Sequence, residues 1–306
     1  RDLHSFPTRR SSDLPMQRIQ PVWRRLVARR YHPAAVWRRR YWAQRAWLKQ
    51  QRIQPNWRRL VVRSYVLEDR NEDARLALLR YRQDFGDENP QWRWLNARVL
   101  LRAGDSESAF ELLTGDGTPQ GVFLRYAAQL LMSPQQAPQV EQAAVKLARQ
   151  LEQPELRGAF WGLAAGAAKL ARQPFKQIEY LEHALSLPVD HELTHGLFEV
   201  DVDQLWDAYL QQGKRIGNQE QKLLGNDEDW YFPATEALAD DPVRARILFS
   251  VLSEYGSSAE RRFVAHGYLV GILDELENGK TLVERLYLES ERYAEVDDLP
   301  PVIRYR

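Results

Sequence analysis

Two stretches of nearly identical sequence decide how this chain is expected to fold: QRIQPVWRRLVARRY at residues 17–31 and QRIQPNWRRLVVRSY at residues 51–65. They agree at 12 of 15 positions and begin 34 residues apart. A repeat of this length is typical of proteins built from stacked copies of one small structural unit, each of which buries its apolar face against the next copy. The alternative, a stretch duplicated during sequence assembly, is opposed by the three mismatches.

More divergent copies keep the same phase downstream. Residues 90–113 (PQWRWLNARVLLRAGDSESAFELL) and residues 162–188 (GLAAGAAKLARQPFKQIEYLEHALSLP) each place small residues where two neighbouring helices would touch. With the 34-residue period, these segments resemble the tetratricopeptide repeat, a pair of antiparallel helices, and the resemblance covers roughly residues 15–188. The small residues that carry it are Ala74, Ala97, Ala109, Ala165 and Ala184.

The remaining chain, residues 189–306, is expected to be helical as well. Asp241 and Pro242 have the residue types of a helix N-cap and first helical position, and apolar residues then recur at intervals of three and four. Alternation with a period of two, which would indicate strands, is absent. We therefore expect an all-α fold in which antiparallel helix pairs stack as a tetratricopeptide-like superhelical solenoid, with 189–306 as degenerate helical repeats or a helical extension.

Both ends of the chain carry unusual sequence. Residues 1–14 (RDLHSFPTRRSSDL) have no apolar periodicity and resemble a translated sequencing adapter, so we interpret them as non-native. Residues 297–306 (DDLPPVIRYR) contain a Pro pair that is typical of a helix start. We therefore expect the chain to be a fragment that is truncated at its C-terminus.

Charge is distributed very unevenly along the chain. Residues 1–65 hold 17 Arg and Lys against 2 Asp and Glu, whereas residues 66–306 hold 26 against 40, although the net charge is only +1. A basic region concentrates anionic ligands near it. The chain contains no cysteine, which excludes disulfides and thiolate metal sites. Because no apolar run approaches the length of a membrane span, we expect a soluble protein. The compartment stays open between the bacterial cytoplasm and the periplasm.

The resemblance also implies where a partner would bind. In tetratricopeptide arrays the first helix of each pair lines a concave groove, and here those helices carry a ladder of arginines with one tryptophan. Guanidinium groups pair in bidentate fashion with carboxylates, so we expect an acidic or extended protein or peptide as the partner. The residues expected to bind it are Arg25, Arg29, Arg59, Arg63, Trp94, Arg98 and Arg102.

A Trp-rich basic segment, residues 34–51 (AAVWRRRYWAQRAWLKQQ), raises the question of other partners. Arginine interleaved with tryptophan also suits single-stranded nucleic acid or an anionic membrane surface. Trp37, Tyr41 and Leu48 nevertheless share one helical face while Arg38 and Arg39 lie off it, as in an ordinary amphipathic helix. Core packing is therefore the favoured explanation of this segment, and nucleic acid and a membrane surface are the less favoured alternatives.

The segment VDHELTHGLF, residues 189–198, contains the H-E-x-x-H spacing of zinc metalloproteases. His191 and His195 would be the zinc ligands and Glu192 the general base. The segment follows Pro188 directly and begins like an exposed first turn, and a recognisable third ligand is missing. We therefore predict no metal site, and the metalloprotease remains an open alternative.

These observations favour a noncatalytic scaffold that recruits a partner, with no cofactor and no catalytic residue. The alternative is the helical arm of a larger enzyme, similar in design to lytic transglycosylases, whose superhelix surrounds a catalytic domain.

Overall fold

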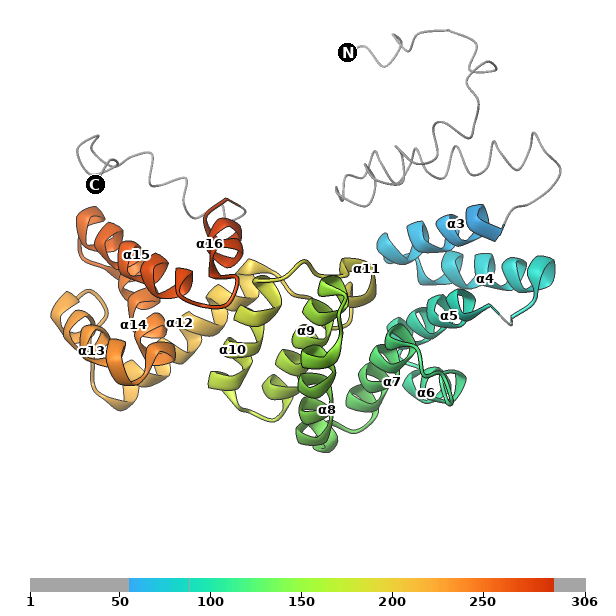
Figure 1. The fold of residues 1–306 in the computed structure, drawn as a ribbon, viewed down its shortest axis with the longest axis horizontal. Coiled ribbons are helices and arrows are strands. Elements are labelled where there is room, and N and C mark those ends of the chain that lie inside the picture. Colours follow the sequence, from blue (N-terminus) through green and yellow to red (C-terminus); the bar gives the residue numbers. More distant parts are fainter. Residues whose placement is uncertain (1–54, 88, 289–306) are drawn as a thin grey trace, which may run out of the picture. The chain divides into compact units, whose positions relative to one another are not determined.

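The computed structural model describes residues 55–87 and 89–288 (Figure 1). The chain forms two compact units, Arg1–Leu95 and Asn96–Arg306, which meet within one helix. In the described part of the first unit, α3 (Pro55–Leu67) packs against α4 (Asn71–Phe85), and α5 (Pro90–Arg102) begins. The earlier sequence copy at 17–31 and the Trp-rich segment at 34–51 lie outside the described residues.

After α5, all the regular secondary structure in the described residues of the second unit is helical. Helices α7 to α10 and α12 to α15 are long, whereas η1 and α11 are single turns. Their bounds are α6 (Ser106–Leu112), α7 (Pro119–Met132), η1 (Pro134–Gln136), α8 (Ala137–Gln150), α9 (Pro154–Leu170), α10 (Pro174–Leu185), α11 (His191–Thr194), α12 (Val202–Gln219), α13 (Asp227–Asp240), α14 (Pro242–Tyr255), α15 (Ala259–Asp274) and α16 (Gly279–Leu288).

Proline marks the first position of many of these helices. α3 begins at Pro55, α5 at Pro90, α7 at Pro119 and α9 at Pro154. The fixed φ of proline suits the first turn, where its missing N–H would have no helical partner. Side-chain caps add to this signal at α14, where Asp241 accepts a hydrogen bond from the backbone N–H at the third helical position at 3.0 Å. The helix start predicted there from the sequence is confirmed.

Helices of the second unit pack mainly on helices that are one or two places away along the chain. α9 packs against both α8 and α10, α14 packs against both α13 and α15, and α10 and α12 join these two groups (Figure 1). Contacts between sequential helices are the pattern of stacked helix pairs. The predicted all-α fold is confirmed, and the packing continues across the boundary predicted near residue 188.

Small residues lie between the helices at the positions expected from the repeat phase. Their side chains are 2% exposed or less, which lets the backbones of adjacent helices approach closely. These residues are Ala74 in the first unit and Ala97, Ala109, Ala165 and Ala184 in the second. Larger apolar side chains, among them Phe123, Phe160 and Trp206, fill the space that remains in the second unit.

None of the described helices combines the length and the apolar character needed to cross a membrane.

Candidate functional site

Three of the predicted partner-binding residues lie in the first unit. Arg59 and Arg63 are one turn apart on α3, Trp94 is on α5, and all three are partly exposed. The guanidinium of Arg59 donates a hydrogen bond to the side-chain oxygen of Asn56, one turn earlier on the same helix. Arg25 and Arg29 lie outside the described residues.

The other two predicted arginines lie in the second unit, against the segment that joins α10 to α12. This connecting segment, residues 188–200, contains the H-E-x-x-H sequence. Arg98 is only 3% exposed, and its Nη2 donates to the carbonyl of His195 over 3.5 Å. The Cζ atom of Arg102 would lie 2.6 Å from a β-carbon added at Gly196. Arg98 was expected to face a groove, but a carbonyl contributed from 97 residues later holds it inside the protein.

The connecting segment folds locally around Glu199. The backbone N–H of Gly196 donates to Glu199 Oε1 at 2.9 Å, and Nδ1 of His195 lies 3.4 Å from the same oxygen. Gly196 has a φ of 70°, a conformation that residues with a β-carbon rarely adopt. Burial lowers the pKa of Arg102, and the nearby carboxylate of Glu199 opposes that shift. Arg102 is partly exposed, so its charge remains available to a partner.

A row of glycines on α9 positions the connecting segment. Gly158, Gly162 and Gly166 are four residues apart and share one face of the helix. A β-carbon added at Gly162 would overlap the side chain of Val200, and one at Gly166 would overlap the ring of Phe198. The connecting segment therefore packs on bare helix backbone. The sequence analysis placed a small residue on this helix at Ala165, but the spacing of these glycines was not recognised there.

The H-E-x-x-H sequence does not lie on one continuous helix. α11 is a single turn that ends at Thr194, and Asp190 caps it by accepting a hydrogen bond from the backbone N–H of Leu193 at 3.1 Å. His195 follows in a turn. The predicted fresh helix start is present, but the segment is not the exposed turn that was expected, since Leu193 and Thr194 are buried. Among the described residues, no group of three or more His, Asp and Glu could hold a metal ion.

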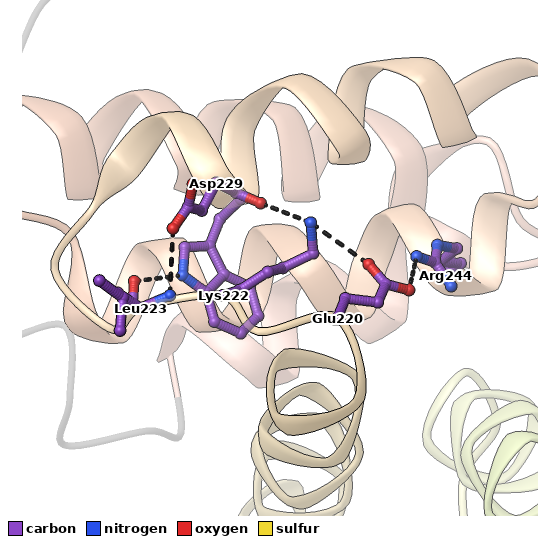
Figure 2. A network of polar contacts seen from close by, with 6 residues as sticks. Glu220, Lys222, Leu223, Asp229 and Arg244 are labelled. Carbon is purple, nitrogen blue, oxygen red and sulfur yellow. Dashed lines mark hydrogen bonds and ion pairs between the residues drawn. The ribbon is translucent and has the colours of Figure 1, made fainter.

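Glu220, a glutamate downstream of the H-E-x-x-H sequence, belongs to a different network (Figure 2). Its carboxylate forms ion pairs with Arg244 on α14 and with Lys222, whose Nζ lies 3.2 Å away. Lys222 also donates to the backbone carbonyl of Asp229 at 2.8 Å, and the Asp229 carboxylate accepts from the backbone N–H of Leu223 at 3.1 Å. This network fixes the loop between α12 and α13.

A pocket that was not predicted from the sequence lies between α8 and α10, which are the second helices of adjacent pairs. Its volume is about 480 Å³. Glu141 is 4% exposed and accepts hydrogen bonds from Lys176 Nζ and from the Tyr180 hydroxyl, both at 2.8 Å. The Tyr180 ring lies 5.5 Å from that of Trp161. The lining residues are Glu141, Gln142, Val145, Lys146, Arg149, Gln150, Lys176 and Tyr180.

The protonation of this pocket follows from its geometry. Burial, together with the hydrogen bond to Glu141, raises the pKa of Tyr180, so the phenol keeps its proton and acts as a donor. Glu141 is therefore held between one ammonium and one hydroxyl group. A signal for this arrangement was present in the sequence, because Glu141 and Lys176 are 35 residues apart, the same interval as Ala74 and Ala109.

In comparisons with known proteins, no family model, curated protein or solved structure matched this chain.

Proposed function

We propose that the protein is a noncatalytic helical-repeat scaffold of the tetratricopeptide type, which binds an acidic, extended partner through basic residues on the first helices of its pairs. The observation that carries the proposal is the placement of Arg59 and Arg63 on successive turns of α3, where both remain partly exposed. Two guanidinium groups at this spacing can pair with carboxylates that recur along an extended chain. Arg98 is excluded by its burial.

The architecture of the protein and the charge of its arginines together support the proposal. Stacked helix pairs present a long surface in which each pair contributes one or two side chains, and such surfaces suit extended ligands. A fold of this kind serves many functions, so the proposal depends on the arginines themselves rather than on the fold.

Fluorescence anisotropy with a labelled peptide of alternating Glu and Ser residues tests the proposal. We expect the substitutions Arg59→Glu and Arg63→Glu together to weaken binding roughly tenfold or more, because each reverses a charge that faces the peptide. The matched control reverses two exposed arginines on the second helix of the same pair, Arg75→Glu with Arg80→Glu, and should leave binding within about twofold.

Measurements at about 0.05 M and about 0.3 M salt distinguish specific binding from diffuse attraction, because screening removes the latter over this range. Unchanged affinity in the α3 variant would contradict the proposal. An equal loss in the α4 control would also contradict it, since net charge alone would then determine binding.

A further inference from the structure

The pocket between α8 and α10 carries an excess of positive charge. Its lining contains three cationic side chains, Lys146, Arg149 and Lys176, and one carboxylate, that of Glu141. Three positive charges against one negative leave an excess of two. Glu141 is already paired with Lys176 and with the Tyr180 hydroxyl, so its charge is compensated within the wall of the pocket. The two other cations of the lining, Lys146 and Arg149 on α8, are both exposed.

The wall of the pocket is held in place from behind. The buried carboxylate of Glu141 positions both Lys176 Nζ and the Tyr180 hydroxyl, each at 2.8 Å, although these two groups come from successive turns of a different helix. The Tyr180 ring packs near Trp161, which is itself 5% exposed. Lys146 and Arg149 are three residues apart on α8 and therefore share one helix face. The pocket thus combines a hydrogen-bonded wall on α10 with two exposed cations on α8.

The size and charge of the pocket indicate the class of ligand. About 480 Å³ lies within the range of small-molecule sites and exceeds what one inorganic oxyanion requires. A phosphate monoester carries close to two negative charges at neutral pH, which matches the excess in the lining. An arginine fork can bind two phosphate oxygens, and lysines add point charges beside it. Val145 and the Tyr180 ring offer apolar surface for a small organic group.

We propose that the pocket between α8 and α10 binds the phosphate group of a small phosphate monoester. Arg149 binds two phosphate oxygens, Lys146 and Lys176 contact the remaining negative charge, and the organic group lies against Val145 and Tyr180. This site goes beyond the proposed scaffold function, since it is formed by second helices of the pairs and takes a small ligand instead of an extended peptide.

Isothermal titration calorimetry on the whole chain tests the proposal, with phenyl phosphate as the probe. We expect saturable binding at one site per chain, and we expect Lys146→Glu with Arg149→Glu to weaken it roughly a hundredfold, about tenfold for each charged contact removed. The matched control, Lys169→Glu with Arg215→Glu, changes one exposed lysine and one exposed arginine that do not line the pocket. It should leave the affinity within about twofold.

Two further ligands test the chemical assignment. Benzenesulfonate has a similar shape but a single negative charge, and succinate carries two negative charges on carboxylates. Both should bind at least tenfold more weakly than phenyl phosphate, in keeping with the loss of one charged contact or of the phosphate geometry.

Three outcomes would overturn the site: absence of saturable binding, equal binding by the Lys146 and Arg149 variant, or an equal loss in the control. Succinate binding as tightly as phenyl phosphate would overturn the phosphate assignment. The acidic-peptide titration with the α3 variant is independent of all four results, so failure of this site and failure of the scaffold function are separable.

Discussion

Glu182 on α10 and Arg246 on α14 are among the most buried charged residues in the described part of the second unit. Their side chains are 4% and 3% exposed. Nε and Nη2 of Arg246 donate to the two carboxylate oxygens at 2.7 and 2.6 Å, and the Tyr209 hydroxyl on α12 donates to Glu182 Oε1 at 2.6 Å. Such a pair gains little net stability, because both charges lose their hydration, but removing one partner leaves the other buried without compensation.

The substitution Arg246→Met is therefore expected to lower the free energy of unfolding by about 3–5 kcal/mol. Adding Glu182→Gln should recover most of this loss, since the amide is neutral and its oxygen still accepts from Tyr209. Urea unfolding followed by circular dichroism measures both. The control is Arg261→Met, which breaks the 3.8 Å ion pair between the exposed Arg261 and Asp227 and should cost less than about 1 kcal/mol. Similar losses for the two single variants would contradict the assignment.

A second residue, His266, makes the stability depend on pH. Its ring lies nearly parallel to that of Trp206, with the centroids 6.4 Å apart. Burial, and to a lesser extent the charge of Arg262, lowers the pKa of His266 to about 4 from an ordinary value of 6.5. The unfolded chain takes up a proton as the pH falls below 6.5, whereas the folded chain keeps this ring neutral. The contribution of the neutral His266 ring to the free energy of unfolding is complete above pH 6.5 and is lost as the pH falls towards 4.

We expect the wild-type protein to lose about 2 kcal/mol more of its free energy of unfolding than His266→Phe when the pH is lowered from 7 to 5. Phenylalanine keeps an aromatic ring beside Trp206 but cannot take up a proton. Urea unfolding at the two pH values gives the difference. Equal losses in the two proteins would show that His266 does not titrate differently in the folded and unfolded states.

Single positions also show what the sequence could and could not predict. Asp241 and Pro242 specify a helix start through local chemistry alone, and the structure confirms it. Arg98 lies on the helix where it was expected, yet its surroundings are set by the backbone of His195, 97 residues away. Nothing in the sequence near Arg98 records that contact. Local signals therefore predicted the helices, whereas the accessibility of side chains depended on segments distant in the chain.

At the scale of elements, the glycine row on α9 shows how one helix face accepts an irregular segment. Gly158 lies against the connecting segment so closely that a β-carbon would come within 2.6 Å of the Pro188 carbonyl oxygen. The β-carbon would meet backbone there, which cannot move aside as a flexible side chain can. The interval of four residues was visible in the sequence, but its partner was not, because residues 188–200 show no regular apolar period.

Replacement of Gly162 by alanine is expected to destabilise the protein by roughly 1–3 kcal/mol, because the new methyl group would overlap Val200. Glycine to alanine within a helix is ordinarily stabilising. The control is Gly267→Ala on α15, where a β-carbon would meet no atom within 4 Å, and this change should stabilise by roughly 0.5–1 kcal/mol. Thermal unfolding of both variants shows whether each substitution stabilises or destabilises the protein. A stabilised Gly162→Ala protein would refute the close packing of the connecting segment.

The pairing of helices also explains why the pocket between α8 and α10 was not predicted from the sequence. The groove was predicted from residues on the first helix of each pair alone, so the basic residues on the second helices were not considered. The 35-residue interval from Glu141 to Lys176 could have placed them opposite each other, since the same interval separates Ala74 from Ala109. The burial of Glu141 could not have been predicted, because it depends on how deeply one helix sits against its neighbours.

At the scale of the whole molecule, stacked helices are expected to transmit destabilisation over short distances. Helices of the second unit pack mainly on helices one or two places away along the chain, so stability is approximately a sum of contributions from helices that pack on one another. α3 and α4 belong to the other compact unit. Loss of the Glu182–Arg246 pair should therefore affect the helices that share it, α10, α12 and α14, well before it affects α3 and α4.

Hydrogen exchange measured by mass spectrometry tests this expectation on the intact chain. In Arg246→Met, amide exchange should accelerate roughly tenfold or more in α10, α12 and α14, because local opening becomes easier by more than about 1.4 kcal/mol. Exchange in α3 and α4 should stay within about twofold of wild type, and Arg261→Met should leave all five helices unchanged at this level. If exchange in α3 and α4 accelerated as much as in α14, the chain would open as one cooperative unit, and the additive view of its helix pairs would be wrong.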